Sequence, residues 1–324
     1  MIKKLLIFTC ICTIILIGGY ELFPKPTVVS AKITKEAPKL GIGAHLLLPN
    51  LNDATIVAPD RPHDPKELQN PKTKSAIKRV RQFSVSTNSQ GFRGPEISKT
   101  KTGLRILCLG DSVTFGWGVE QEESYPSLIA KSLSLDVINA GIPAMKPRHI
   151  ALWSSDLRSL KPDIILFARR PDWSAPNAMD SYQQAVRRIQ ANFATAKLGI
   201  ILPPISTFDP RGLAQAPKER AEIRNRLPNI PFLDLTPVFH SNMPKRGYKL
   251  VIDGGTQKMI DRKNGQIYRE GNAAQGLAKE IIDAFEEDKQ VQEPLFFDGG
   301  HPDKEGFILF SVKVEEWMRQ QGWI

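Results

Sequence analysis

Ser112 is the first residue of this chain whose surroundings suit chemistry. It lies in segment 110–116, Gly-Asp-Ser-Val-Thr-Phe-Gly, directly after the apolar run 104–109. A serine just past the carboxyl end of a buried parallel strand occupies the place where open α/β sheets carry their sites. A helix that begins there points backbone N–H groups toward an anion beside the hydroxyl. Because an isolated Gly-Asp-Ser triplet is more often a surface turn, the interpretation requires a partner for the serine.

Candidate partners lie far along the chain, in segment 297–302, Phe-Asp-Gly-Gly-His-Pro. A serine nucleophile needs a base, and the base needs an acceptor that orients it. Asp298 and His301 are separated by two glycines, which allow the carboxylate to fold back onto one imidazole nitrogen. The other nitrogen is then free to face Ser112. The remaining histidines have no such neighbour: His45, His63, His149 and His240.

The elements that must position these residues follow from five short apolar runs. The runs cover 104–109, 135–139, 163–168, 198–202 and 231–235. Amphipathic stretches such as 150–160 and 182–197 lie between them, and a final helix is expected over 303–320. Such alternation is typical of βαβ units and a buried parallel sheet. The sequence therefore predicts a three-layer α/β/α sandwich, flavodoxin-like, with a mostly parallel sheet of about five strands.

Residues 245–270 break this alternation. Short runs with strand character are separated by Asp-Gly-Gly at 253–255 and Lys-Asn-Gly at 263–265, which predicts a β-hairpin insertion. The segment carries 7 Lys/Arg against 3 Asp/Glu. From this charge we hypothesise that the insertion favours an anionic ester substrate.

Taken together, the motifs match a family pattern. The chain resembles the SGNH/GDSL hydrolases, a family of serine esterases and acyl-modifying enzymes, from about residue 88 to its C-terminus. The resemblance rests on four short segments: 88–94, 110–116, 139–141 and 298–302. The Gly-x-Ser-x-Gly elbow of α/β-hydrolases is absent, because Thr114 occupies its last position.

The resemblance implies a mechanism. Ser112 attacks an ester carbonyl, His301 accepts the serine proton, and Asp298 holds the imidazole. The backbone N–H groups of Ser112 and Gly141 stabilise the oxyanion. The resemblance also implies an α/β/α sandwich, an acyl ester or O-acylated glycan as substrate, and no cofactor or metal.

One segment departs from the family pattern. The family usually has Gly-x-Asn-Asp after the third strand, where the asparagine donates to the oxyanion, but this chain has Pro171 before Asp172. Losing one oxyanion donor costs about 10²–10³ in rate. Either Arg169 or Arg170 supplies the missing donor, or catalysis is weakened, or the protein is a non-catalytic glycan-binding scaffold.

Composition and charge exclude several classes. With 324 residues, 41% apolar and 24% charged, the chain is not collagen-like, a coiled coil, a polytopic membrane protein or mostly disordered. The net charge of +10 is concentrated in residues 1–100, which carry 15 Lys/Arg against 7 Asp/Glu. The remainder has 29 against 27 and no basic stripe interleaved with aromatics, which argues against nucleic-acid binding. No Cys/His cluster has zinc-ligand spacing, so no metal is expected.

The N-terminal region predicts an exported protein. Lys3 and Lys4 precede an uncharged run over 5–20, which indicates a single-pass membrane anchor or, alternatively, a cleaved secretion signal. We therefore expect an anchor over 1–23, a proline-rich stalk and lead-in partly wrapped on the domain over 24–85, and an SGNH-type domain over 86–324. The catalytic domain is expected outside the cytoplasm.

The expected function is an exported or membrane-tethered serine esterase or deacylase that hydrolyses small O-acyl esters. An O-acyltransferase of envelope glycans and a non-catalytic glycan-binding scaffold remain the alternatives. The residues do not name a substrate-binding site.

Overall fold

The computed structural model describes residues 32–62, 70, 72, 76–273 and 276–324. The predicted anchor over 1–23 lies outside the described residues. Among the residues that are described, no helix is long and apolar enough to cross a bilayer.

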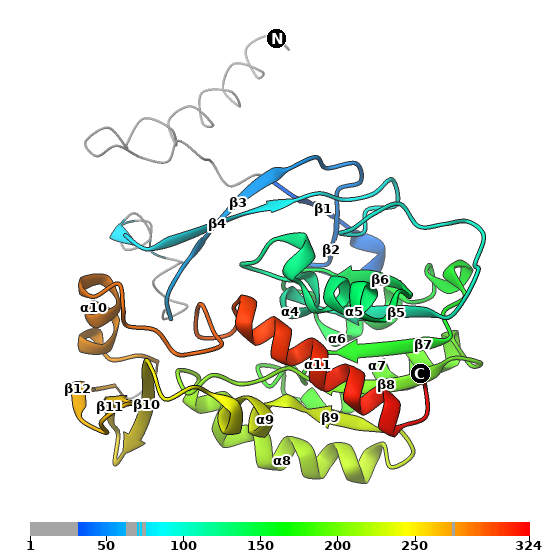
Figure 1. The fold of residues 1–324 in the computed structure, drawn as a ribbon. Coiled ribbons are helices and arrows are strands. Elements are labelled where there is room, and N and C mark those ends of the chain that lie inside the picture. The colour runs from blue at the N-terminus through cyan, green and yellow to red at the C-terminus, as the bar shows by residue number, and fades with distance from the viewer. Residues whose placement is uncertain (1–31, 63–69, 71, 73–75, 274–275) are drawn as a thin grey trace, which may run out of the picture.

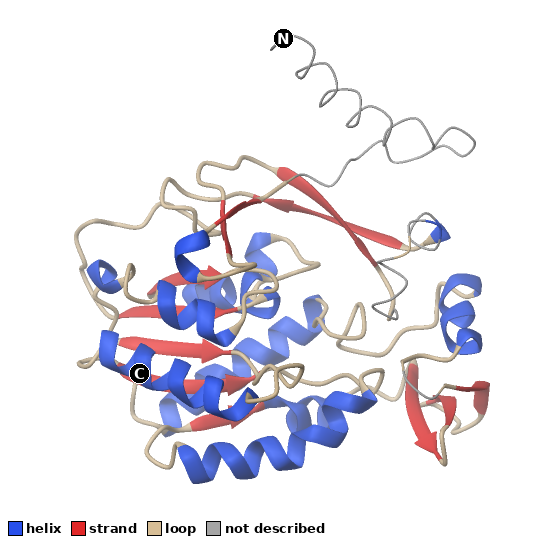
Figure 2. Cartoon of the chain, turned by 180° about the vertical axis from the view of Figure 1, so that it is seen from behind, coloured by secondary structure: helices blue, strands red, loops and turns tan. Residues whose placement is uncertain are grey.

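A five-stranded parallel sheet forms the centre of the molecule (Figures 1 and 2). In spatial order its strands are β6 (Asp136–Gly141), β5 (Arg105–Gly110), β7 (Ile164–Ala168), β8 (Lys197–Leu202) and β9 (Phe232–Asp234). Every predicted apolar run forms one of these strands, so the predicted fold class is confirmed. In order along the chain the strands lie 2-1-3-4-5, which is the flavodoxin-like arrangement.

Helices cover both faces of this sheet. One face carries α6 (Pro147–Trp153), α7 (Ala178–Asn192) and α8 (Pro210–Arg226). The other carries α5 (Tyr125–Leu133), α9 (Leu235–Asn242) and α11 (Lys304–Gln320). Alternate strand residues feed the two cores, because successive side chains of a strand point to opposite faces. Leu107 and Leu109 of β5 join the first cluster, and Ile106 and Cys108 join the second.

The lead-in is more structured than a stalk. Its described part forms two antiparallel pairs, β1 (Thr34–Glu36) with β2 (His45–Leu47) and β3 (Ala54–Pro59) with β4 (Val80–Val85). Apolar side chains of this segment, such as Leu47, Ile56 and Phe83, belong to the same core as α6 and α7. Prolines are tolerated here because they stand at element ends: Pro38 opens a 3₁₀ turn and Pro59 closes β3. Residues 24–31 lie outside the described residues.

The predicted insertion is a three-stranded antiparallel sheet. It consists of β10 (Tyr248–Asp253), β11 (Thr256–Asp261) and β12 (Ile267–Asn272), followed by α10 (Lys279–Glu287). The sheet and α10 enclose a small apolar cluster of their own. The insertion is thus a satellite of the sandwich (Figure 1).

Candidate active site

The nucleophile turn, residues 110–116, joins β5 to the short helix α4 (Ser112–Phe115). Asp111 caps the helix, and its Oδ1 accepts a hydrogen bond from the Val113 N–H at 3.1 Å. Gly116 ends the helix in the left-handed region with φ 85°, where glycine carries no steric cost. The turn therefore sets Ser112 at the carboxyl end of a buried central strand, in the first turn of a helix.

Asp298 and His301 lie on one loop, residues 297–302, just before α11. Asp298 is buried, and its Oδ1 accepts from the backbone N–H groups of Gly300 and His301, each at 2.7 Å. The Phe297 N–H donates to the His301 carbonyl at 3.2 Å, which closes the loop on itself. The two glycines thus let the carboxylate fold back toward the imidazole, as the spacing predicted.

The three side chains form a continuous hydrogen-bonded chain. His301 Nδ1 lies 2.8 Å from Asp298 Oδ2, and His301 Nε2 lies 2.8 Å from Ser112 Oγ. With the Nδ1 proton donated to the carboxylate, Nε2 accepts the serine hydroxyl proton. The imidazole is 22% exposed, whereas Asp298 is 5% exposed. The arrangement therefore has a buried orienting acid, a half-buried base and a hydroxyl within proton-transfer distance.

The electrostatic environment of Asp298 and His301 favours proton transfer from Ser112. Burial lowers the pKa of His301, but the charge of Asp298 and its hydrogen bond outweigh burial, so the pKa of His301 is raised. Burial raises the pKa of Asp298, but His301 and the backbone N–H donors outweigh burial, so the pKa of Asp298 is lowered. The carboxylate consequently stays ionised beside the imidazole and stabilises the imidazolium that forms when the serine gives up its proton.

Strand order, motif positions and this side-chain geometry agree with the family pattern seen in the sequence. The chain has the SGNH-hydrolase fold. No protein-family model matches the sequence, and no curated protein matches it. The fold is therefore recognised through the structure and the short motifs together.

Solved structures do resemble this chain. A G-D-S-L family lipolytic protein from Desulfitobacterium hafniense is 16% identical, with a TM-score of 0.42 over 66% of this chain and 99% of that one. A family two carbohydrate esterase from Clostridium thermocellum is 10% identical, with a TM-score of 0.42 over 76% and 82%. The lipopolysaccharide acetyltransferase periplasmic domain of Salmonella ser. Paratyphi A is 11% identical, with a TM-score of 0.40 over 68% and 85%.

The Gly141 N–H, which the resemblance implied as an oxyanion donor, has a partner within its own strand. It donates to Asn139 Oδ1 at 3.0 Å, so the donor is already engaged. A Cβ at this position would lie 2.1 Å from the Phe115 backbone nitrogen. Glycine is thus required because the end of β6 approaches the backbone of α4 too closely for any side chain. The structure thus gives Gly141 a close-packing role, and its role as an oxyanion donor stays a prediction.

Arg169 is the arginine that reaches the nucleophile turn. It follows β7, whose last residue, Ala168, pairs with Gly110 of β5. Its Nε lies 3.1 Å from Asp111 Oδ2 and donates to the Met145 carbonyl at 3.2 Å. The guanidinium therefore lies across the carboxyl ends of β5 and β6, one residue from Ser112, and carries a full positive charge there.

Arg170 belongs to a different cluster. Its guanidinium pairs with Glu219 and with Asp234, the latter at 2.8 Å, and donates to Thr236 Oγ1 at 2.7 Å. Its Nε donates to the Pro203 carbonyl at 2.7 Å. Because these partners engage its donors, Arg170 is a structural residue, and the sequence alternative of an oxyanion role for it is corrected.

Arg93 is a buried residue whose importance sequence reasoning missed. It is 1% exposed, and its guanidinium donates to the carbonyls of Phe115 and Gly116 at 2.9 and 2.7 Å. It also donates to the carbonyls of Ser84 and Val119 at 2.9 and 2.8 Å. Burial lowers the pKa of Arg93 to about 10. Segment 88–94 thereby holds the C-terminal end of α4 through Arg93, and the resemblance of this segment to the family pattern was the only sequence signal for it.

Aromatic side chains surround the imidazole. The Phe297 ring stacks on it with 5.7 Å between centroids, and the Trp117 ring lies 6.3 Å from it. Arg81 of β4 lies over Phe297, 4.9 Å from its centroid. The sequence had offered no substrate-binding residue, so these side chains around His301 were identified only from the structure.

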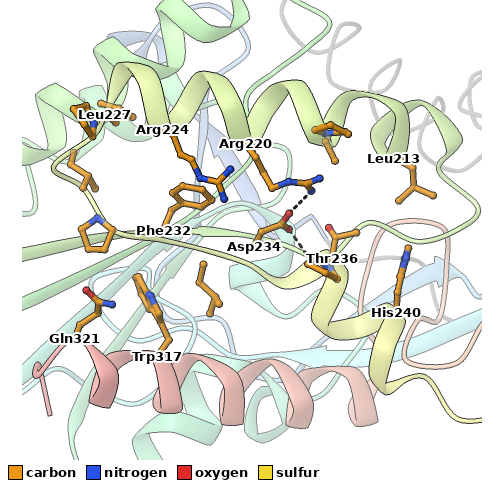
Figure 3. A pocket seen from close by; sticks show the side chains of 17 residues that line it. Leu213, Arg220, Arg224, Leu227, Phe232, Asp234, Thr236, His240, Trp317 and Gln321 are labelled. Atoms are coloured by element: carbon orange, nitrogen blue, oxygen red, sulfur yellow. Dashed lines mark hydrogen bonds and ion pairs between the residues drawn. The ribbon is translucent and has the colours of Figure 1, made fainter.

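A hollow in the described part of the chain lies away from these residues (Figure 3). It has a volume of about 910 Å³ and opens between α8, β9 and α11. Arg220 of α8 pairs with Asp234 at 2.8 Å, and the Arg224 guanidinium lies 5.4 Å from the Phe232 ring centroid. None of Ser112, Asp298 and His301 lines this hollow.

Ion pairs offset much of the basic charge of the insertion. Four of its seven basic side chains pair with carboxylates: Arg246 with Glu305, Lys258 with Asp253, Arg262 with Glu293, and Arg269 with Glu287. Three of these carboxylates lie outside the insertion. The hypothesised preference for an anionic substrate therefore loses the charge excess on which it depended.

Proposed function

We propose that this protein is a serine esterase that hydrolyses small O-acyl esters, with a glycan hydroxyl as the alcohol. The observation that carries the proposal is the chain of two 2.8 Å contacts from Asp298 through His301 to Ser112. A buried acid, an oriented imidazole and a hydroxyl at the end of a central strand are the parts that acyl transfer requires.

The proposed reaction proceeds through an acyl-enzyme. Ser112 Oγ attacks the ester carbonyl while His301 Nε2 takes its proton, and the imidazolium then protonates the departing alcohol oxygen. Water, activated by the same imidazole, attacks the acyl-enzyme, releases the carboxylic acid and restores the serine. The Ser112 backbone N–H and the Arg169 guanidinium are proposed to stabilise the oxyanion, since both lie at the nucleophile turn.

The acyl group is proposed to be small. A long acyl chain needs an extended apolar cavity beside the nucleophile. The hollow of Figure 3 is lined by none of the three proposed catalytic residues, and the same holds for a second hollow beside Leu104 and Lys197. Because neither of these two hollows reaches Ser112, we propose an acyl group of acetyl size.

The location is proposed from the sequence. Lys3 and Lys4 before the apolar run over 5–20 support an anchored protein whose catalytic domain lies outside the cytoplasm. Fusing a reporter that is active only after export to the C-terminus tests this: activity is expected, and its absence in expressed protein contradicts the proposal.

Active-site labelling tests the function. The full-length protein in detergent is incubated with a fluorophosphonate probe and with p-nitrophenyl acetate. We expect labelling and hydrolysis in the wild type and neither in Ser112→Ala, with circular dichroism as the control for folding. Folded wild type that neither labels nor hydrolyses would overturn the esterase and favour a non-catalytic scaffold. Acyl transfer to an added glycan that exceeds hydrolysis would favour the acyltransferase.

A further inference from the structure

Trp117 is held beside the proposed nucleophile by the backbone. It follows Gly116, whose left-handed conformation turns the chain at the end of α4. The Trp117 N–H donates to the Ser112 carbonyl at 2.9 Å. The position of the indole is therefore coupled to that of Ser112 through one short turn.

The ring of Trp117 is only half-buried, although it touches the apolar core. Its aromatic neighbours are the rings of His301 at 6.3 Å, Phe83 at 5.4 Å and Phe115 at 6.3 Å between centroids. The interplanar angles are 41°, 74° and 43°, so none of the three rings lies flat on the indole. Phe83 and Phe115 are buried and support the indole from the core side.

The indole N–H of Trp117 has no partner within the described part of the chain, and its nitrogen is not among the buried polar atoms that lack one. Trp173 provides the contrast, since its Nε1 donates to Glu219 at 2.9 Å. Indole N–H groups usually find a partner when buried. Trp117 thus presents an aromatic surface and a free donor beside His301.

The proposed chemistry fixes where the alcohol of the ester must lie. Because His301 Nε2 protonates the departing oxygen, that oxygen must come within hydrogen-bond distance of the imidazole. The rest of the alcohol then lies against the side chains that surround His301. The Trp117 ring is one of these, and the side chain is only half-buried among the described residues.

We propose that Trp117 is the platform on which a pyranose ring of the substrate stacks, with the indole N–H donating to a sugar oxygen. This inference rests on the proposed esterase function, because it places the sugar as the leaving alcohol. A pyranose presents a face of C–H groups edged by hydroxyls, which suits an aromatic side chain with an apolar body and a polar tip. Trp117 therefore selects cyclic sugar esters over acyclic esters of similar polarity.

A pair of polyol acetates tests the platform. Glucose pentaacetate and glycerol triacetate differ in that only the first has a ring, and acetate release from each is followed by pH-stat in the full-length protein. We expect Trp117→Ala to lower kcat/KM for glucose pentaacetate roughly tenfold more than for glycerol triacetate, which is the size of a good aromatic contact. Trp117→Phe keeps a ring and loses the N–H, so a smaller loss is expected. An equal loss for both esters would overturn the inference.

Trp323→Phe is the matched control. Trp323 is also half-buried, but it packs on Trp317 and on Gly199 of β8, away from the nucleophile turn. Its ratio of the two kcat/KM values should equal that of the wild type. The fluorophosphonate labelling rate of each variant reports whether the site itself is intact, because this probe carries no sugar.

A binding measurement separates this inference from the proposed function. Ser112→Ala protein is titrated with glucose pentaacetate by saturation-transfer NMR, with and without Trp117→Ala. Binding that depends on Trp117, together with a folded wild type that never labels, would overturn the esterase and leave the platform standing. If the wild type labels and Trp117→Ala leaves sugar binding unchanged, the platform is contradicted and the esterase function is not.

Discussion

Two clusters of charged side chains lie near the central sheet, one around Ser112 after β5 and one around Arg170 after β7. They differ in whether a polar group is left without a protein partner. In the first, Asp298 and His301 pair at 2.8 Å, and the imidazole keeps a contact to the Ser112 hydroxyl. In the second, Arg170 pairs with Glu219 and Asp234. Only the first ends in a partly exposed imidazole beside a serine hydroxyl.

The second cluster is saturated. Its carboxylates are 2% and 6% exposed, and further donors reach them from Trp173 and Arg220. Burial raises the pKa of Glu219 despite Arg170, whereas the arginines and Thr236 outweigh burial and lower the pKa of Asp234. A buried ion network in which every polar group has a protein partner serves to hold structural elements together. A catalytic group must instead keep one hydrogen-bonding position free for the substrate.

The largest expected effect is that of Asp298→Asn in the first cluster. An amide cannot stabilise the imidazolium and favours the wrong imidazole tautomer, so kcat should fall by about 10³–10⁴. Hydrolysis of p-nitrophenyl acetate by protein shown to be folded by circular dichroism measures it. A loss of less than tenfold would mean that Asp298 only shapes the loop.

The saturated cluster should respond in stability. Arg170→Met leaves Glu219 and Asp234 buried without their shared cation, which costs about 3–5 kcal/mol of unfolding free energy. Urea denaturation measures this loss. The kcat per fluorophosphonate-labelled site should stay at the wild-type value; a fall in that value at unchanged stability would place Arg170 in the chemistry after all.

The preceding arginine should show the opposite behaviour. Arg169→Met removes the proposed charged donor, and we expect kcat to fall by about 10²–10³ with KM little changed. Arg169→Lys keeps the charge and should recover part of the rate. If both variants instead lose unfolding free energy and keep kcat, Arg169 serves only to pair with Asp111.

The smallest expected effect is a shift in the pH profile, which tests how strongly Asp298 raises the pKa of His301. The proposed base works when neutral, and the pKa of His301 is raised from 6.5, so kcat/KM should rise with pH through a midpoint above that value. Asp298→Asn removes the cause of the increase and should move the midpoint to lower pH. Stopped assays across the acid range on both proteins measure it, and an unchanged midpoint would assign the titration to another group.

Much of the fold was readable from the sequence because the signals are local. Each of the five apolar runs became a strand of the sheet, since a parallel strand buried on both faces must be continuously apolar. The pairing of Asp298 with His301 was also readable, because it depends on a spacing of three residues across two glycines. The order of the lead-in was underestimated, since its prolines break long elements but permit the short strands that pack on the core.

By itself, the sequence determined the fold class, the nucleophile turn and the Asp–His loop. Tertiary structure decided what depends on contacts between distant segments. Arg169 pairs with Asp111, whereas Arg170 pairs with Glu219, although the two arginines are adjacent in the sequence and chemically identical. Tertiary structure also brought the Arg93 guanidinium to the carbonyls of Phe115 and Gly116 at the end of α4. Neither outcome is encoded by spacing, because each depends on which partner the packing of neighbouring segments brings within hydrogen-bond distance.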